Sequence, residues 1–241
     1  MAGKNMSEFQ NKLLSIIMGG LLVVSMLAIA REAAMYTASE TLQVEEGFCV
    51  VIDAGHGGSD PGKVGINGAL EKDLNLSIAL KLKQFLEAND VQVVLTRESD
   101  EGLYDADASN KKVQDMKRRV SLIEETKPAL TVSIHQNSYP EEYVHGVQVF
   151  YYETSTEGKK LAEMLQTRLV MDLDPENTRQ IKANDSYYLL KKTPTPIVIV
   201  ECGFLSNQAE ADKLCTDWYQ EKLAWAIHLG ILQYLNATVH T

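Results

Sequence analysis

The chain has 241 residues, of which 45% are hydrophobic and 23% charged, the composition of an ordinary globular protein, and its length suits one domain plus an additional segment at one end. Residues 1–30 hold two lysines and one glutamate, so the remainder carries 21 basic and 32 acidic side chains, a formal net charge of −11. A body this acidic repels phosphate backbones, which argues against nucleic acid as a partner.

The additional segment comes first. Lys4 and Lys12 precede an uncharged, mostly apolar run, Leu13–Ala30, which ends in an A-x-A sequence. A basic start, an apolar centre and this ending describe a secretory signal, although a run of 18 residues is also near the lower limit for spanning a bilayer. We therefore expect a signal peptide or N-terminal membrane anchor over residues 1–30, a linker over residues 31–47, and action outside the cytoplasmic membrane.

Strand-like and helix-like patterns alternate from residue 48 to residue 236, and residues 237–241 form a tail. The apolar, β-branched runs predict strands at Cys49–Asp53, Val91–Thr96, Ala129–Ile134, Gly146–Tyr152, Tyr187–Leu190 and Ile197–Val200. Apolar residues at steps of three and four predict helices around Leu74–Leu86, Val113–Ile123, Leu161–Leu169 and Trp218–Leu235. This alternation predicts a single α/β domain with a largely parallel or mixed sheet and helices on both faces.

The first predicted strand leads into a glycine-rich loop that carries one imidazole. Residues 50–62 read VVIDAGHGGSDPG, with His56 in the loop. Glycine lets the backbone turn sharply, and the loop follows the carboxyl end of a strand, where open α/β sheets place their ligands. Taken alone, His56 is also compatible with a solvated loop histidine.

Polar side chains follow two further predicted strands directly, namely His135 and Glu201. An unpaired carboxylate at the end of a buried strand costs several kcal/mol unless a cation or hydrogen bonds compensate for it. Glu71, at the start of a helix, adds a second carboxylate. Two histidines and one carboxylate form a catalytic zinc set with a fourth position open, and the other carboxylate can then serve as a base.

Other interpretations of these residues stay open. Glu71 fits a helix-start carboxylate favoured by the helix dipole, and His135 fits a hydrogen-bonded core histidine. Cys202 is an alternative nucleophile, which would need His135 within hydrogen-bond reach. We expect His145 to face solvent or to lie at the rim of the site, and His228 to have a structural role. The three cysteines are too few for a disulfide framework, and the sequence has no G-x-S-x-G elbow, P-loop or dinucleotide fingerprint.

At these residues the chain resembles the zinc-dependent N-acetylmuramoyl-L-alanine amidases of the amidase 3 family. Four blocks carry the resemblance, in order, within about residues 48–236: IDAGHGG at 52–58, LEKDLNL at 70–76, SIHQN at 133–137 and VECGFLSN at 200–207. The resemblance implies a six-stranded mixed sheet with helices on both faces. It also implies Zn²⁺ as cofactor, with His56, Glu71 and His135 as ligands and Glu201 as the catalytic residue. Gln136 and Lys63 depart from the residues common in the family, and neither removes a ligand.

Within the family, the chain is most similar to the germination-specific amidases of spore-forming bacteria, through LYDAD at 103–107, HQNSYP at 135–140 and SYYLLK at 186–191. The resemblance implies removal of stem peptides from cortex peptidoglycan, so that muramic-δ-lactam can form. Alternatives are a vegetative cell-wall amidase, a zinc peptidase acting within the stem peptide, and a catalytically silent wall-binding domain. Peptidoglycan is the expected partner. The sequence leaves open whether an activating protein takes part.

Overall fold

The computed structural model describes residues 14, 17–26, 30 and 47–239. Residues 17–26 are helical, and none of the described helices combines the length and the apolar character that crossing a membrane requires. The predicted leader and linker lie largely outside the described residues and remain predictions, whereas the first three residues of the predicted tail, 237–239, continue the last helix and only residues 240–241 lie outside the described part. The fold described below is that of the compact unit Val44–Thr241.

The centre of this unit is one mixed sheet. Within the described residues its strands are β1 (Cys49–Ala54), β2 (Gln92–Leu95), β3 (Leu130–Asn137), β4 (Gln148–Tyr152), β5 (Lys182–Asn184) and β6 (Ile197–Phe204). The strand order is β2-β1-β3-β6-β4-β5, and every neighbouring pair is parallel except β4 and β6. The predicted six-stranded, mixed and largely parallel sheet is therefore confirmed.

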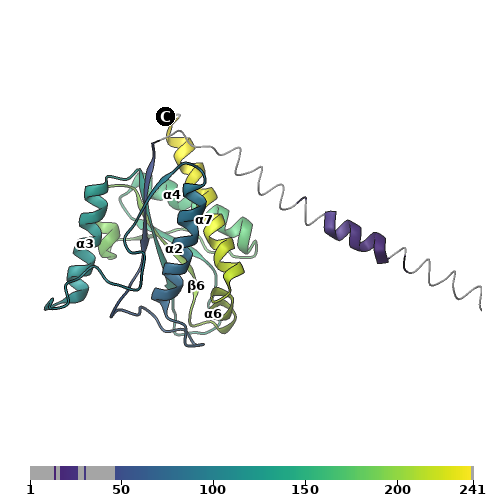
Figure 1. Ribbon diagram of the computed structural model, residues 1–241, viewed down its shortest axis with the longest axis horizontal. Helices are drawn as coiled ribbons and strands as arrows, with labels where there is room; N and C mark the ends of the chain where they lie inside the picture. The colour runs from purple at the N-terminus through teal and green to yellow at the C-terminus, as the bar shows by residue number, and fades with distance from the viewer. Residues whose placement is uncertain (1–13, 15–16, 27–29, 31–46, 240–241) are drawn as a thin grey trace, which may run out of the picture. The chain divides into compact units, whose positions relative to one another are not determined.

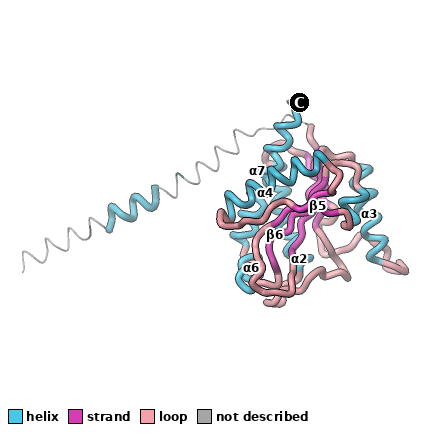
Figure 2. The backbone as a smooth tube through the Cα atoms, turned by 180° about the vertical axis from the view of Figure 1, so that it is seen from behind, coloured by secondary structure: helices cyan, strands magenta, loops and turns pink. Residues whose placement is uncertain are grey.

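Helices cover both faces of the sheet (Figures 1 and 2). One face carries α2 (Glu71–Glu87), α4 (Thr156–Leu173) and α7 (Asp217–Val239), and α7 packs against the other two. Because α7 is enclosed by its neighbours, it is apolar on nearly all sides. The opposite face carries α3 (Lys111–Thr126) and α5 (Tyr188–Lys192), while the short α6 (Gln208–Leu214) follows β6.

Alternation along the strands decides which side chains reach the α3 and α5 face. Val51 of β1 and Ile199 of β6 pack there with Ile123 of α3 and Leu189 of α5 in one buried cluster. Side chains two residues apart along a strand share a face, and parallel neighbours in register do so too. The residues that follow Ile199 on this face of β6, and their neighbours on β3, therefore lie at the carboxyl end of the sheet, where their side chains can line a cleft.

One predicted strand is wrong. The run Tyr187–Leu190 leads into α5, and its two leucines are buried in the cluster between α3 and the sheet. The strand lies earlier, at Lys182–Asn184, where it pairs only with β4 at the edge of the sheet and is at least partly exposed along its length. An exposed edge strand needs no apolar alternation, so its sequence carried no strand pattern.

Two central strands also run further than predicted. β3 continues to Asn137 and β6 to Phe204, so His135 and Glu201 lie inside these strands instead of after them. The two residues are paired in register, and the pairing shifts between His135 and Asn137. Neighbouring strands thus place an imidazole and a carboxylate side by side on the same face of the sheet.

Candidate active site

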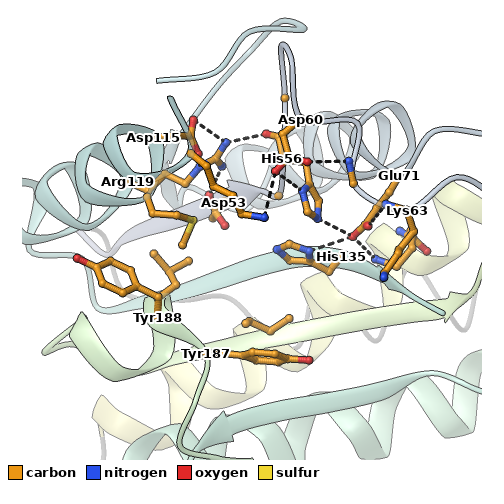
Figure 3. Close-up of a pocket in the computed structure, with 18 of the residues that line it drawn as sticks. Asp53, His56, Asp60, Lys63, Glu71, Asp115, Arg119, His135, Tyr187 and Tyr188 are labelled. Carbon is orange, nitrogen blue, oxygen red and sulfur yellow. Dashed lines mark hydrogen bonds and ion pairs between the residues drawn. The ribbon is translucent and has the colours of Figure 1, made fainter. Parts of the chain in front are cut away.

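The glycine-rich loop after β1 turns the ring of His56 back over the sheet. His56 has a left-handed backbone, with φ of 63°, and Gly57 and Gly58 continue the turn with φ of 134° and 56°. The imidazole Nε2 lies 3.2 Å from Oε1 of Glu71, and Nδ1 lies 3.0 Å from Oδ2 of Asp60. The Asp60 carboxylate therefore fixes the ring so that Nε2 faces Glu71, as Figure 3 shows.

Glu71 is the first residue of α2, and its carboxylate lies between the two imidazoles. Only 2% of its surface is exposed, and Oε1 is 3.0 Å from Nδ1 of His135 and accepts a hydrogen bond from the Gln136 amide at 3.1 Å. Its other oxygen accepts a hydrogen bond from the Lys63 amide at 2.8 Å. The ring of His135 lies so close to Gly55 that a Cβ there would come within 2.3 Å of Nε2.

The charged forms of Glu71 and His135 stabilise each other. Burial alone would raise the pKa of Glu71, but hydrogen bonds to His135 and His56 and the charges of both imidazoles hold it far below its usual range. Burial alone would lower the pKa of His135, but its hydrogen bond and charge interaction with Glu71 raise it. Without a metal ion, the carboxylate thus depends on the imidazoles for compensation of its buried charge.

The donor set fits a divalent metal. One nitrogen each of His56 and His135 and one oxygen of Glu71 lie within 4.8 Å of one another. Zinc bonds of 2.0–2.1 Å in a tetrahedron place neighbouring ligand atoms about 3.3 Å apart. The measured separations from Glu71 Oε1, 3.2 Å to His56 and 3.0 Å to His135, are close to that value. These atoms could therefore bind a metal ion after only small movements.

Glu201 faces the same pocket from β6 and has a different environment. Its side chain is 7% exposed, and Oε2 has no hydrogen-bond partner among the described residues. The pKa of Glu201 is raised to about 7, chiefly by burial and also by the charge of Glu71, while the charges of His135 and His56 oppose the rise. An ionisable oxygen that is buried and unpartnered at a cleft points to a group, such as a water or a substrate atom, that it would bind there.

The pocket around these four residues has a volume of about 800 Å³ and is open on one side. Figure 3 shows Tyr187 and Tyr188 across the pocket from His135. Basic side chains at the start of α3 and tyrosines contribute much of the remaining wall; they include Lys111, Lys112 and Tyr104. The wall is thus both polar and aromatic, as ligand sites commonly are.

Sequence reasoning missed two residues that contact this site, Asp60, whose carboxylate contacts the ring of His56, and the buried Arg119, which contacts the backbone of the loop. Arg119 follows Met116 by three residues and precedes Ile123 by four. A charged residue within the inward stripe of a helix was the available signal.

The alternative nucleophile is not supported by the structure. Cys202 follows Glu201 on β6, so its side chain is on the opposite face of the sheet, and its thiol contacts the Val200 carbonyl at 3.7 Å. Burial raises its pKa well above the ordinary range, which disfavours a thiolate. His145 is exposed, and His228 is buried in α7; neither lines the pocket. The three cysteines, all within the described residues, are free.

An α/β domain with two imidazoles and two carboxylates at one open pocket has the constitution of a metal-dependent hydrolase. The chain belongs to the Amidase_3 family of N-acetylmuramoyl-L-alanine amidases, whose sequence model matches residues 50–233. The predicted family and enzyme class are thereby confirmed.

Similar proteins cover most of the domain. The germination-specific N-acetylmuramoyl-L-alanine amidase of Bacillus subtilis is 38% identical over 193 residues, 79% of this chain and 81% of that protein. LytC, an N-acetylmuramoyl-L-alanine amidase of the same organism, is 31% identical over 236 residues, 96% of this chain and 44% of that protein. The CwlD amidase from Clostridioides difficile, solved in complex with the GerS lipoprotein, is 39% identical with a TM-score of 0.77, over 79% of this chain and 100% of that one.

Proposed function

We propose that this chain is a zinc amidase that hydrolyses the bond between N-acetylmuramic acid and L-alanine in peptidoglycan. The observation that carries the proposal is the meeting of His56, Glu71 and His135 in one pocket, with Glu201 paired in register beside His135. In this proposal the first three residues are the zinc ligands and Glu201 is the catalytic acid and base.

A zinc ion held by the three ligands would polarise the lactyl carbonyl and lower the pKa of a water. Glu201 would take a proton from that water as the water oxygen forms a bond to the carbonyl carbon. The same carboxyl would give a proton to the alanine nitrogen as the carbon–nitrogen bond breaks, which leaves a muramic acid carboxylate and a free L-alanine amine. A carboxyl whose pKa is near 7 exchanges protons readily at neutral pH, which suits both steps.

We further propose that the biological substrate is spore cortex peptidoglycan, in which removal of stem peptides precedes formation of muramic-δ-lactam. The Bacillus subtilis relative named for germination supports this role. The Clostridioides difficile relative, solved with a lipoprotein, supports a protein partner outside the cytoplasmic membrane. The basic start and apolar run of residues 1–30 support export by a signal peptide or membrane anchor.

The function is tested with the purified full chain, loaded with zinc, on intact cortex and vegetative peptidoglycan, followed by mass spectrometry of the released fragments. An amidase leaves intact, peptide-free glycans and free L-alanine amino termini. A peptidase leaves muramic acid that still carries L-alanine, and a wall-binding domain releases nothing; either result contradicts the proposal. Equal action on both materials would support amidase activity and contradict the cortex role.

The separate roles of the two carboxylates are tested by substitution. Glu201→Gln should retain zinc and lose on the order of 10²–10⁴-fold in turnover, the usual range for general acid–base catalysis. His135→Ala should lose zinc and activity together. Metal analysis and peptide release are measured on the same folded samples. Loss of zinc in Glu201→Gln would instead make Glu201 a ligand and leave Glu71 as the candidate base.

Export is tested with a reporter enzyme fused after Ala30. We expect activity only outside the membrane, and Asp in place of Leu21 and Leu22 should abolish it, because each charge at the centre of an inserting helix costs roughly 2.5–3.5 kcal/mol. A reporter active only in the cytoplasm would contradict export.

A further inference from the structure

Two buried arginines hold three consecutive backbone carbonyls at the end of β1. Arg119 of α3 donates from Nη2 to the carbonyl of His56 at 2.6 Å and from Nη1 to that of Ala54 at 2.9 Å. Arg97, just after β2, donates from Nε to the carbonyl of Ala54 at 2.9 Å and from Nη2 to that of Gly55 at 3.1 Å. The backbone that leads to His56 is therefore bound to guanidinium groups at each of its last three carbonyls.

Arg119 is itself held rigidly. Its side chain is 2% exposed, Nη1 is 2.6 Å from Oδ1 of Asp53, and Nε is 2.6 Å from Oδ2 of Asp115. Asp53 is fixed in turn by the hydroxyl groups of Thr96, directly after β2, and Ser133 on β3. Charge-assisted hydrogen bonds of this kind are short and strong, and a buried guanidinium with both its charge and its donors satisfied has little freedom to move.

The backbone of His56 needs such support. Its φ of 63° lies in the left-handed region, which costs a residue with a side chain roughly 1–2 kcal/mol. Conformations of this kind persist where the surrounding structure over-determines them. Here Arg119 fixes the carbonyl of His56, and Asp60 fixes its ring nitrogen at 3.0 Å. Together the two contacts aim Nε2 at Glu71.

We propose that Arg119 is a positioning residue of the metal site, which holds the backbone of His56 so that its ring is placed for metal binding before the metal arrives. Arg97 supports the same loop one residue earlier. The inference rests on the proposed function in that His56 is taken as a metal ligand. Arg119 acts through the carbonyl of His56, and no contact of Arg119 itself with substrate is invoked.

Lysine at position 119 separates charge from geometry. Its single ammonium keeps the positive charge but cannot reproduce the planar fork that reaches Asp53, Asp115 and two carbonyls at once. Partners that orient a metal ligand typically contribute 10–100-fold to metal affinity. Arg118 offers a matched control, because it is the next residue on the same helix and forms an exposed ion pair with Asp105 at 2.6 Å.

The experiment measures zinc affinity of the full chain by competition with a chromophoric chelator, at a temperature where circular dichroism shows each variant folded. Arg119→Lys should bind zinc 10–100-fold more weakly than the parent, and Arg118→Lys should match the parent. The visible spectrum of the cobalt-substituted protein should change in Arg119→Lys alone. A purely structural role would lower the melting temperature of the metal-free protein and leave both metal readouts unchanged.

Folded Arg119→Lys with zinc affinity within threefold of the parent would overturn the inference. If Arg119→Lys does not fold, Arg97→Lys decides by the same measurement: weaker zinc binding supports the proposal, and affinity within threefold of the parent overturns it. A parent protein that binds no zinc would contradict the proposed function itself, so the two failures are distinguishable.

Discussion

Replacing Glu201 with glutamine should stabilise the metal-free protein at alkaline pH, although it removes the proposed base. Burial raises the pKa of Glu201 from its usual value of 4.5 to about 7, so the folded state keeps a proton that the unfolded state has released. The stability that protonated Glu201 contributes is therefore complete below the pKa of Glu201 in the unfolded state and is lost as pH rises through its pKa in the folded state. At about 1.4 kcal/mol per pKa unit, this raised pKa lowers stability, relative to that at low pH, by roughly 2–4 kcal/mol at pH 8, where folded Glu201 is ionised, and by about 1 kcal/mol at pH 5, where only the unfolded state releases the proton.

The assay is denaturant and thermal unfolding of the metal-free full chain at pH 5 and pH 8. The advantage of Glu201→Gln over the parent should grow by roughly 2–3 kcal/mol between the two pH values, which corresponds to about 5–10 °C in Tm for a domain of this size. Glu221→Gln serves as a control, because Glu221 is exposed on α7. The difference between pH values is the informative quantity, since any cost of burying the glutamine amide does not depend on pH.

A constant difference between Glu201→Gln and the parent at both pH values would refute this reasoning, as would a variant that becomes less stable at pH 8. Added zinc supplies a further check. A bound cation favours the ionised form of a neighbouring carboxylate, so zinc should reduce the advantage of the variant.

Two other substitutions test the site and the core. Gly55→Ala should weaken zinc binding at least tenfold, because its Cβ would lie 2.3 Å from the ring of His135; unchanged affinity by chelator competition would show that the ring has room to move. His228→Leu should reduce the loss of stability in acid, because burial lowers the pKa of His228 to about 4, and the neutral ring therefore contributes stability above about pH 6.5 that is lost as pH falls toward 4. Between pH 7.5 and pH 4.5, urea unfolding should show a loss of stability that is roughly 2–3 kcal/mol smaller in the variant than in the parent. Parallel pH profiles of the two proteins would contradict this.

The parts of the fold that sequence patterns predicted are those with a buried face. β1, β3 and β6 are central, so their apolar runs predicted strands, and α2, α3 and α4 each carry an inward apolar stripe, whereas α7 was predicted from a long run that is apolar on nearly all sides. The run Tyr187–Leu190 has the composition of a strand but is too short to show a period, and its leucines are buried equally well in a helix. Lys182–Asn184 forms a strand by pairing with β4 at the edge of the sheet. A pairing of this kind leaves no pattern in the local sequence.

The four residues of the candidate site were all predicted from the sequence, but only the resemblance to the family assigned Glu71 to the metal and Glu201 to catalysis. From the residues alone, either Glu71 or Glu201 could have been the ligand. The two differ in the structure because the start of α2 brings Glu71 between both imidazoles, whereas Glu201 on β6 has an oxygen without a partner. The contacts of Arg119 could not be predicted from local sequence patterns, because its partners Asp53 and His56 lie more than 60 residues away along the chain.

The pairing of β3 with β6 has a consequence for when the enzyme can become active during its biogenesis. His56, Glu71 and His135 all emerge from the ribosome before residue 136, yet the strand that flanks His135 and carries Glu201 is made only after residue 196. A shorter nascent chain leaves one edge of β3 without its partner strand, and contacts this distant in sequence form late and slowly. An exported chain that crosses the membrane unfolded would therefore gain the capacity to cut peptidoglycan only when its last strand is in place.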